Sequence, residues 1–309
     1  MREIPESLAG RPFTVAEALA AGVSARMLDG GRFRRLFRGV HVVAAEEPTP
    51  RTWLRAAVLA GPSDAVVSHR SAQELYGPEL SGGDDRIHLS TRRNAVSRDE
   101  RITVHRRLHP VASHQVDGLP VTTAARTFVD CALSLTFLQL VVFGDWLIHR
   151  GLVEFDELLH YCRGRHLDGV VNARRAMQYL VADARSPMET LVRLMIVLSG
   201  LPHPACNVRI VDDAGHLVAT PDLQWARFKV VVEYDGVWHE RSPDDRRWQR
   251  DRREELERRG WTVIVVHDTD LAKPVSIVTR VHDALVRGGY RGPRPAFSPR
   301  WHRVIRERL

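Results

Sequence analysis

The chain has 309 residues, of which 44% are hydrophobic and 27% are charged. This is an ordinary globular composition, which excludes an intrinsically disordered chain and leaves room for two or three domains with their own cores. Lysine and arginine together number 45 against 38 acidic residues, giving a formal net charge of +7 and an isoelectric point near 9.9. This excess of positive charge favours a polyanionic partner.

Cysteine usage and hydropathy bear on the compartment. The chain has three cysteines, Cys131, Cys162 and Cys206, which are too widely spaced for a CxxC metal motif and odd in number for a secreted disulfide framework. No apolar run reaches the roughly 18 residues of a membrane span, and the first residues lack the apolar core of a signal peptide. We therefore expect a cytoplasmic protein that does not associate with membranes.

Residues 14–43 have the order helix, turn, short helix and two-stranded hairpin. Thr14 and Glu17 form a capping box that predicts the start of the first helix, and Ser24 is suited to cap the second. The predicted elements are helices over 15–20 and from 25 to about 29, and strands over 33–36 and 40–43 around a turn at Gly39. This order predicts a winged helix-turn-helix domain over residues 1–50.

Arginines are concentrated on the second helix and the hairpin of this segment, where residues 24–38 contain five arginines and the single acid Asp29. In a winged helix-turn-helix the second helix meets base edges and the wing meets phosphates, so cations belong at both places. A solvated basic hairpin is the alternative interpretation. The predicted DNA-binding residues are Ser24, Arg26, Arg32, Arg34, Arg35 and Arg38.

The middle of the chain divides into two regions. Residues 51–125 form a small α+β region, with helices predicted over 53–59 and 71–76 and strands over 87–90 and 102–105. Residues 126–184 carry apolar residues at helical spacing and predict a helical connector. His69, His88 and His105 show no metal-ligand spacing, and we interpret them as structural.

Residues 185–290 have the character of an α/β domain, and a basic, proline-rich tail follows over 291–309. A helix begins after Ser186 with Pro187 at its first position and ends at Gly200. Strands rich in β-branched residues are predicted over 217–220, 229–233 and 262–267, and a strongly charged helix over 243–259. The predicted order of elements in this domain is therefore α-β-β-β-α-β or a close variant.

Two acidic residues stand out because they lie at predicted strand ends. Asp222 follows Pro221 at the end of one strand, and Glu233 ends the next. Carboxylates on adjacent strands can converge on one divalent ion, as metal-dependent phosphodiester hydrolysis requires. Acids among valines and leucines are costly to bury without a partner, so a purely structural role explains them poorly.

Two resemblances to known families extend this interpretation. The stretches 13–24, 31–40, 68–72 and 118–130 resemble the N-terminal region of AbiEi-type antitoxins, which implies sequence-specific, often autoregulatory DNA binding. Residues 186–271 resemble the very-short-patch-repair-like branch of the PD-(D/E)xK nuclease superfamily. The matching positions are Glu189, Pro221-Asp222, Glu233-Tyr-Asp235-Gly236, Trp238-His239 and the stretch 251–263.

The second resemblance implies a restriction-endonuclease-like three-layer fold with a mixed central sheet, so the overall fold class is multidomain α+β and α/β. It implies that Asp222 and Glu233 hold Mg²⁺ or Mn²⁺, that Glu189 supports the metal site, and that His239 is the general base or organises the attacking water. The catalytic candidates are thus Glu189, Asp222, Glu233 and His239.

The match departs from the superfamily at one important position, because Asp235 stands where its lysine is expected. His239, or an arginine of the charged helix such as Arg247 or Arg250, could replace that lysine, or the site has lost catalysis. Structural interpretations also remain: Glu189 completes a capping box with Ser186, and Asp235-Gly236 is a turn signal. His239 could equally be a hydrogen-bonded histidine beside a core tryptophan.

These observations predict a metal-dependent endonuclease that acts on double-stranded DNA. The alternative is a non-catalytic transcriptional regulator, similar to an antitoxin, with a decayed nuclease fold; RNA processing is a third possibility. A homo-oligomer and a toxin-like partner are both compatible with the sequence.

Overall fold

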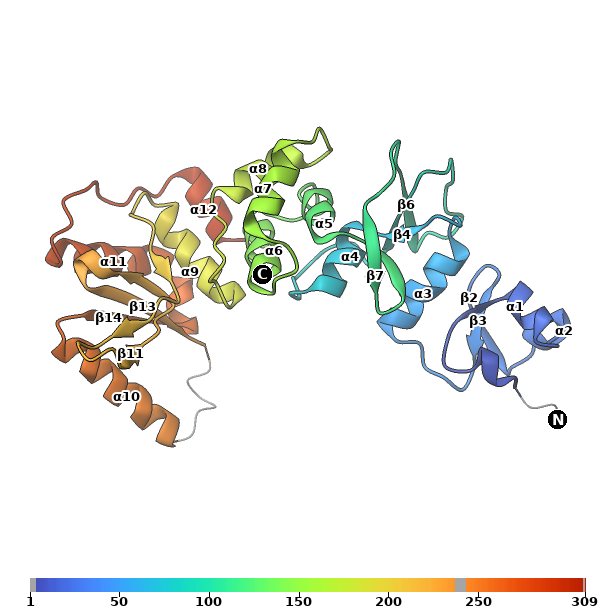
Figure 1. Ribbon diagram of the computed structural model, residues 1–309, viewed down its shortest axis with the longest axis horizontal. Helices are drawn as coiled ribbons and strands as arrows, with labels where there is room; N and C mark the ends of the chain where they lie inside the picture. The colour runs from blue at the N-terminus through green and yellow to red at the C-terminus, as the bar shows by residue number, and fades with distance from the viewer. Residues whose placement is uncertain (1–3, 237–242, 308) are drawn as a thin grey trace. The chain divides into compact units, whose positions relative to one another are not determined.

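The computed structural model describes residues 4–236, 243–307 and 309, and it divides the chain into two compact units (Figure 1). Unit 1 contains residues 1–134 and 166–170, and unit 2 contains residues 135–165 and 171–309. Both units mix helices with mixed or antiparallel sheets, in agreement with the predicted α+β class. No helix within the described ranges is both long enough and apolar enough to span a bilayer.

The first part of unit 1 is built around a small three-stranded antiparallel sheet of order β1-β3-β2. Its elements are η1 (Glu6–Leu8), β1 (Phe13–Thr14), α1 (Val15–Ala20), α2 (Ala25–Leu28), β2 (Phe33–Phe37) and β3 (Val40–Val43). Thr14 and Glu17 form the predicted capping box, with the Glu17 N–H donating to Thr14 Oγ1 at 3.2 Å. Leu8, Phe13, Ala18, Val23, Leu28, Phe33 and Val43 form one buried cluster. The predicted helices and hairpin are therefore confirmed.

The second part of unit 1 contains a five-stranded mixed sheet of order β6-β5-β4-β8-β7. Its elements are α3 (Pro50–Ala60), β4 (Val66–Val67), α4 (His69–Tyr76), β5 (Ile87–Thr91), β6 (Ile102–Arg106), β7 (Ser113–Val116), β8 (Leu119–Thr122) and α5 (Ala124–Cys131). β5 pairs in parallel with β6 and antiparallel with β4. The predicted helices and the strands around 87–90 and 102–105 are present, and α5 belongs to this unit rather than to a separate connector.

Unit 2 combines a group of helices with a second sheet. The helices are α6 (Phe137–His149), α7 (Phe155–Arg163), α8 (Val170–Met177, whose first residue belongs to unit 1), α9 (Pro187–Val197) and α12 (Pro299–Ile305). Helix α12 lies in the segment expected to be a basic tail. Its Trp301 is 1% exposed and donates from Nε1 to the Met195 carbonyl at 2.8 Å, so the end of this segment packs on α9.

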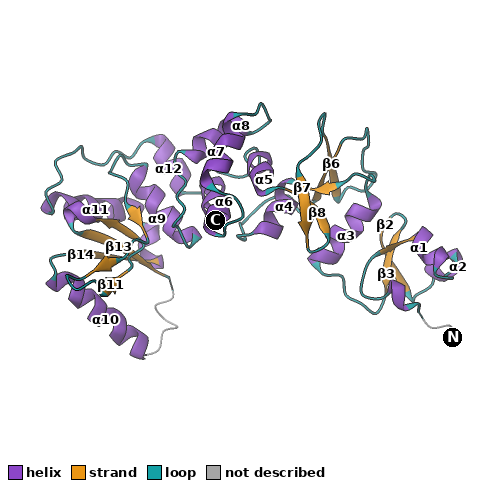
Figure 2. Ribbon diagram, viewed as in Figure 1, coloured by secondary structure: helices purple, strands orange, loops and turns teal. Residues whose placement is uncertain are grey.

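The sheet of unit 2 has the order β14-β13-β12-β9 and is mixed, since β13 and β14 are parallel and the other pairs are antiparallel. The elements of this region are β9 (Ala205–Cys206), β10 (Ile210–Val211), β11 (Leu217–Ala219), β12 (Leu223–Trp225), η2 (Ala226–Phe228), β13 (Val230–Asp235), α10 (Pro243–Arg258), β14 (Thr262–His267), η3 (Asp268–Ala272) and α11 (Pro274–Arg287). Leu256 of α10 packs on Val231 of β13, while α9 and α11 contact the sheet from the other side (Figure 2).

The strand predicted over residues 217–220 does not belong to the main sheet of unit 2. Residues 217–219 pair with β10 in a separate two-stranded ribbon and not in the four-stranded sheet. Pro221 has no N–H to donate, so the ladder cannot continue through it and a new strand begins at Leu223. Asp222 therefore lies at the start of β12 rather than at the end of the preceding strand.

Candidate active site

Asp222 and Glu233 lie opposite each other across two antiparallel strands. The register pairs Leu223 with Val232, so one further step places Asp222 opposite Glu233. On the other side of β12, Leu223 pairs with Cys206, and the Asn207 N–H donates to the Asp222 carbonyl at 3.0 Å. Residues opposite each other in antiparallel strands share a face. Asp222, which comes immediately before β12, and Glu233, which lies two residues before the end of β13 rather than ending its strand as expected, therefore share one face of the sheet.

Glu189 joins this row from the first turn of α9. It is 9% exposed, and its Oε2 accepts hydrogen bonds from the Arg185 N–H at 3.0 Å and from Asn207 Nδ2 at 2.7 Å. Ser186 caps the helix as expected, since its Oγ accepts from the Glu189 N–H at 3.2 Å, but the expected capping box is incomplete because the Glu189 carboxylate accepts from the Arg185 N–H instead of the Ser186 N–H. The Glu189 carboxylate therefore reaches beyond the cap to Asn207, a residue that no sequence motif marks.

The neighbouring carboxylates act electrostatically on Asp222. Burial, together with the negative charges of Glu189 and Glu233, raises the pKa of Asp222 to about 6 against the opposing effects of the Tyr234 N–H and Arg252. That N–H donates to Asp222 Oδ2 at 2.7 Å and fixes the carboxylate. A carboxyl group with a pKa raised by burial and by like charges is typical of a functional site.

Arg252 of α10 forms an ion pair with Glu233. Its Nη2 donates to Glu233 Oε1 at 2.5 Å, and both side chains are more than four-fifths buried. Arg247 and Arg250, the arginines suggested by the sequence, are exposed on the same helix. Asp235, at the position of the superfamily's lysine, is 5% exposed. The positively charged side chain that pairs with Glu233 therefore comes from helix α10, whereas the superfamily's lysine comes from the strand.

Two questions remain for the catalytic candidates, namely the position of His239 and whether the three acids form a metal site. His239 lies outside the described residues. Glu189, Asp222 and Glu233 are not a preformed metal cage, because among the described residues the group of three potential ligands that lies within 4.8 Å is a set of histidines in unit 1.

The predicted DNA-binding residues lie on one small part of unit 1. Ser24 caps α2, with its Oγ accepting from the Met27 N–H at 3.4 Å, and Arg26, Arg35 and Arg38 are exposed. Arg32 is half-buried just before β2. Arg34 forms an exposed ion pair with Glu47 at 3.0 Å. Helix α2 has only four residues, which is a single turn and shorter than the prediction to residue 29.

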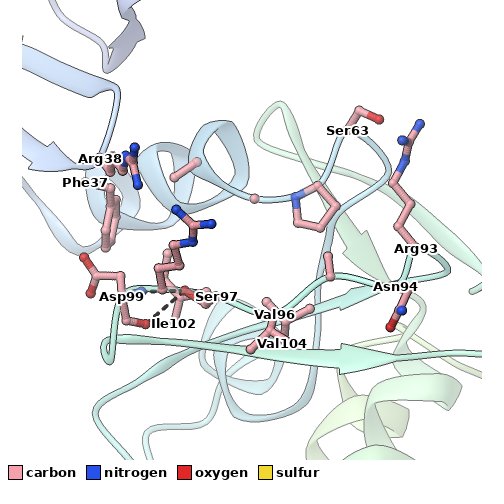
Figure 3. A pocket seen from close by; sticks show the side chains of 15 residues that line it. Phe37, Arg38, Ser63, Arg93, Asn94, Val96, Ser97, Asp99, Ile102 and Val104 are labelled. Carbon is pink, nitrogen blue, oxygen red and sulfur yellow. Dashed lines mark hydrogen bonds between the residues drawn. The ribbon is translucent and has the colours of Figure 1, made fainter.

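A groove of about 1070 Å³ opens beside the hairpin (Figure 3). Phe37 and Arg38 form one side, and the loop before β6, with Arg93 and Arg98, forms another. Arg101 holds these parts together, because its Nη2 donates to the Leu36 carbonyl at 2.7 Å and its guanidinium lies over the Phe37 ring. The arginine-bearing loop of 92–98 thus continues the basic surface of the hairpin, which was not predicted from the sequence.

Comparison with known proteins gives distant relatives. No family model matches the chain. Two curated relatives from strains of Mycobacterium tuberculosis, Uncharacterized protein MT2308 and Uncharacterized protein Rv2248, are each 26% identical over 271 residues, covering 85% of this chain and 96% of the relative. Among solved structures, the RV2827C protein from Mycobacterium tuberculosis is similar with a TM-score of 0.38 and 16% identity, over 65% of this chain and 84% of that one. These names state no activity, so the site must be interpreted from its own residues.

Proposed function

We propose that the protein is a metal-dependent endonuclease that hydrolyses phosphodiester bonds in DNA. The observation that carries this proposal is the meeting of Glu189, Asp222 and Glu233, with the raised pKa of Asp222 as its electrostatic consequence. Like charges placed together in a partly buried site are stabilised by a cation, and a nuclease of the PD-(D/E)xK kind needs such a set of acids.

The donor set fits a hard divalent cation. Carboxylate oxygens are the ligands that Mg²⁺ and Mn²⁺ prefer, and here Asp222 and Glu233 would hold the ion with Glu189 beside them. When bound, such an ion would act as a Lewis acid on the phosphate and would make water a better nucleophile.

The chain's own residues would orient these ligands. Asn207 holds the Glu189 carboxylate through its side-chain amide and the Asp222 backbone carbonyl through its own N–H, while the Tyr234 N–H fixes Oδ2 of the Asp222 carboxylate. Arg252, paired with Glu233, lies where a fixed positive charge could stabilise the charge that develops on a phosphate. In this arrangement Arg252 takes over the role that the superfamily gives to its lysine.

Unit 1 would bind the duplex as a winged helix-turn-helix. The hairpin arginines Arg34, Arg35 and Arg38 would contact phosphates, and Arg93 and Arg98 at the edge of the groove would extend that contact. Because α2 is a single turn, Ser24 and Arg26 at its start offer few contacts to base edges. We therefore expect most of the affinity to come from the backbone of the DNA and to depend strongly on salt.

A second candidate function is a non-catalytic DNA-binding regulator, with a toxin-like protein as a possible kind of partner. The ion pair between Arg252 and Glu233 favours it, because a guanidinium already neutralises one of the two metal ligands. Asp235 at the lysine position favours it too.

Cleavage assays separate the two functions. Supercoiled plasmid, linear duplex and RNA are incubated with the protein in Mg²⁺ or Mn²⁺, in parallel with Asp222→Asn, Glu233→Gln and the control Asp213→Ala, which changes an exposed turn residue of the same unit. We expect DNA cleavage by the wild type and the control and none by the two isosteric variants. A wild type that shifts duplex and leaves every substrate intact would sink the enzyme proposal.

The DNA interface has its own test. Replacing Arg34, Arg35 and Arg38 together with alanine should weaken duplex binding and reduce the slope of log affinity against log salt by about 0.9 for each phosphate that the protein no longer neutralises. An unchanged affinity would place the interface elsewhere.

A further inference from the structure

Three histidines that are separated in the sequence meet in unit 1. His69 is the first residue of α4, His88 lies on β5 and His105 on β6. Each offers a ligand nitrogen, and these nitrogens lie within 4.8 Å of one another. This meeting could not be expected from the sequence, because the spacings between the three residues match no metal motif.

The parallel pairing of β5 and β6 brings two of the rings together. Ser90 is the register partner of His105, and His88 lies two residues before Ser90, so both histidines project from the same face of the sheet. His88 Nδ1 and His105 Nε2 are 2.9 Å apart, and the His69 ring stacks on that of His105 with 3.6 Å between centroids. Two strands and the start of a helix therefore build one cluster.

The surroundings keep these imidazoles neutral. Burial, reinforced by His105 and Arg107, lowers the pKa of His69 to about 2. Burial also lowers the pKa of His105 to about 4, with His88 as the next cause. A neutral imidazole carries a lone pair on one ring nitrogen, which is the form that binds a metal ion.

Two further observations at this cluster point to a ligand. His69 has a φ of 52°, a left-handed conformation that is unfavourable for a residue with a side chain and that is common at functional sites. His88 Nε2 is buried and has no hydrogen-bond partner among the described residues, while Asp84 Oδ2 lies 3.8 Å away. A metal-bound histidine typically presents its other ring nitrogen to a carboxylate, as His88 does to Asp84.

We propose that His69, His88 and His105 bind a Zn²⁺ ion. Imidazole nitrogens suit Zn²⁺ and neighbouring transition metals, whereas Mg²⁺ prefers oxygen ligands, so this site is chemically distinct from the carboxylates of unit 2. Three protein ligands leave a fourth coordination position for water or another ligand. The His69 side chain is 14% exposed, so the cluster can be reached from the surface.

Charged groups beside the cluster hold the His69 side chain in place. Asp130 is buried, and its Oδ1 lies 4.0 Å from His69 Nε2. Arg107 donates to Asp130 at 2.9 Å and also contacts His69 Nε2 at 2.9 Å, and Arg126 pairs with the same carboxylate. On metal binding, His69 exchanges its contact with Arg107 for the ion, and Arg107 keeps its bond to Asp130.

Zinc binding by the full chain tests this proposal without any nuclease readout. Protein purified without a histidine tag is stripped with a chelator and titrated with Zn²⁺ by calorimetry and against a chromophoric chelator, and Co²⁺ loading is followed by visible absorption. The variants are His88→Gln and His105→Gln, with His109→Gln as the control because His109 is exposed in the same unit. Asp222→Asn controls for metal at the carboxylates.

We expect one tightly bound Zn²⁺ in the wild type, His109→Gln and Asp222→Asn proteins, and an affinity weaker by about 100-fold or more in His88→Gln and His105→Gln. Far-ultraviolet circular dichroism and thermal unfolding without metal establish that the variants are folded. If either variant is unfolded, the visible spectrum of the Co²⁺-loaded wild type tests the proposal. That spectrum must be the one expected for a cobalt ion with nitrogen ligands. Wild-type protein that retains no Zn²⁺, or folded cluster variants that bind it as the wild type does, would overturn the proposal.

Discussion

Asn207 Nδ2 donates a 2.7 Å hydrogen bond to Glu189 Oε2, while the backbone N–H of the same residue donates to the Asp222 carbonyl at 3.0 Å. One residue thereby connects the first turn of α9 with the start of β12. Asn207 adopts a φ of 51°, which asparagine tolerates better than most residues. It is a positioning residue for two of the three acids.

Replacing Asn207 with glycine should lower the maximal cleavage rate by about 10–100-fold, the range found when groups that orient metal ligands are removed. Glycine adopts the same left-handed backbone freely, so the turn and the fold should survive. Cleavage rates measured over a range of Mg²⁺ concentrations check this, together with thermal unfolding. A variant that is folded and cleaves at the wild-type rate would show that Glu189 needs no such support.

The ion pair of Arg252 with Glu233 gives a prediction that distinguishes the two candidate functions. If Arg252 stabilises developing charge on the phosphate, Arg252→Gln should reduce kcat by about 10²–10³-fold. Its affinity for Mg²⁺ should not fall, because Glu233 is then free to bind the ion. Arg250→Gln, at an exposed position of the same helix, is the control. Cleavage that rises in Arg252→Gln would identify the ion pair as inhibitory and contradict a catalytic role for Arg252, whereas no cleavage by either protein would favour the regulator.

The local elements of this fold could be predicted because local signals determine them. The capping box of Thr14 and Glu17 and the proline at the start of α9 mark helix starts with side chains adjacent in the sequence. Strand partners depend on contacts across the chain, and so the pairing of β11 with β10 in a separate ribbon was not predicted. The same holds for α12, whose Trp301 is buried by residues far away in the sequence.

The candidate sites show the same difference between features with a local sequence signal and features that depend on contacts across the chain. Asp222 and Glu233 could be singled out because acids among strand residues are unusual and match a motif. Arg252 could not, since it is one of seven arginines within residues 243–259 and only packing decides which one faces Glu233. The histidine cluster was missed because a parallel register and a helix start bring its members together, and neither has a local signature.

Arg34 is held by Glu47 in an exposed ion pair, and exposed pairs contribute roughly 0–1 kcal/mol. A phosphate can therefore displace Glu47 at little cost. We expect Glu47→Gln to increase duplex affinity a few-fold at low salt and to steepen the salt dependence, because Arg34 is released and one repelling charge is removed. Glu79→Gln removes the same charge from an exposed position away from the hairpin and is the control. Equal affinities in the two variants would mean that net charge alone acts.

The raised pKa of Asp222 predicts how stability varies with pH. Burial and the neighbouring carboxylates raise this pKa to about 6 from an ordinary value of 3.8, so between these pH values the folded chain binds a proton that the unfolded chain has lost. The stabilisation from this group is therefore complete below about pH 4 and is lost as the pH rises through 6. Asp222→Asn keeps an acceptor for the Tyr234 N–H and does not titrate. With a chelator present to remove metal ions, we expect the free energy of unfolding of Asp222→Asn to exceed that of the wild type by on the order of 1–3 kcal/mol above pH 6. Below pH 4 the two proteins should be equally stable. Thermal unfolding from pH 4 to 8 measures this, and a difference that does not change with pH would contradict the electrostatic coupling of the three acids.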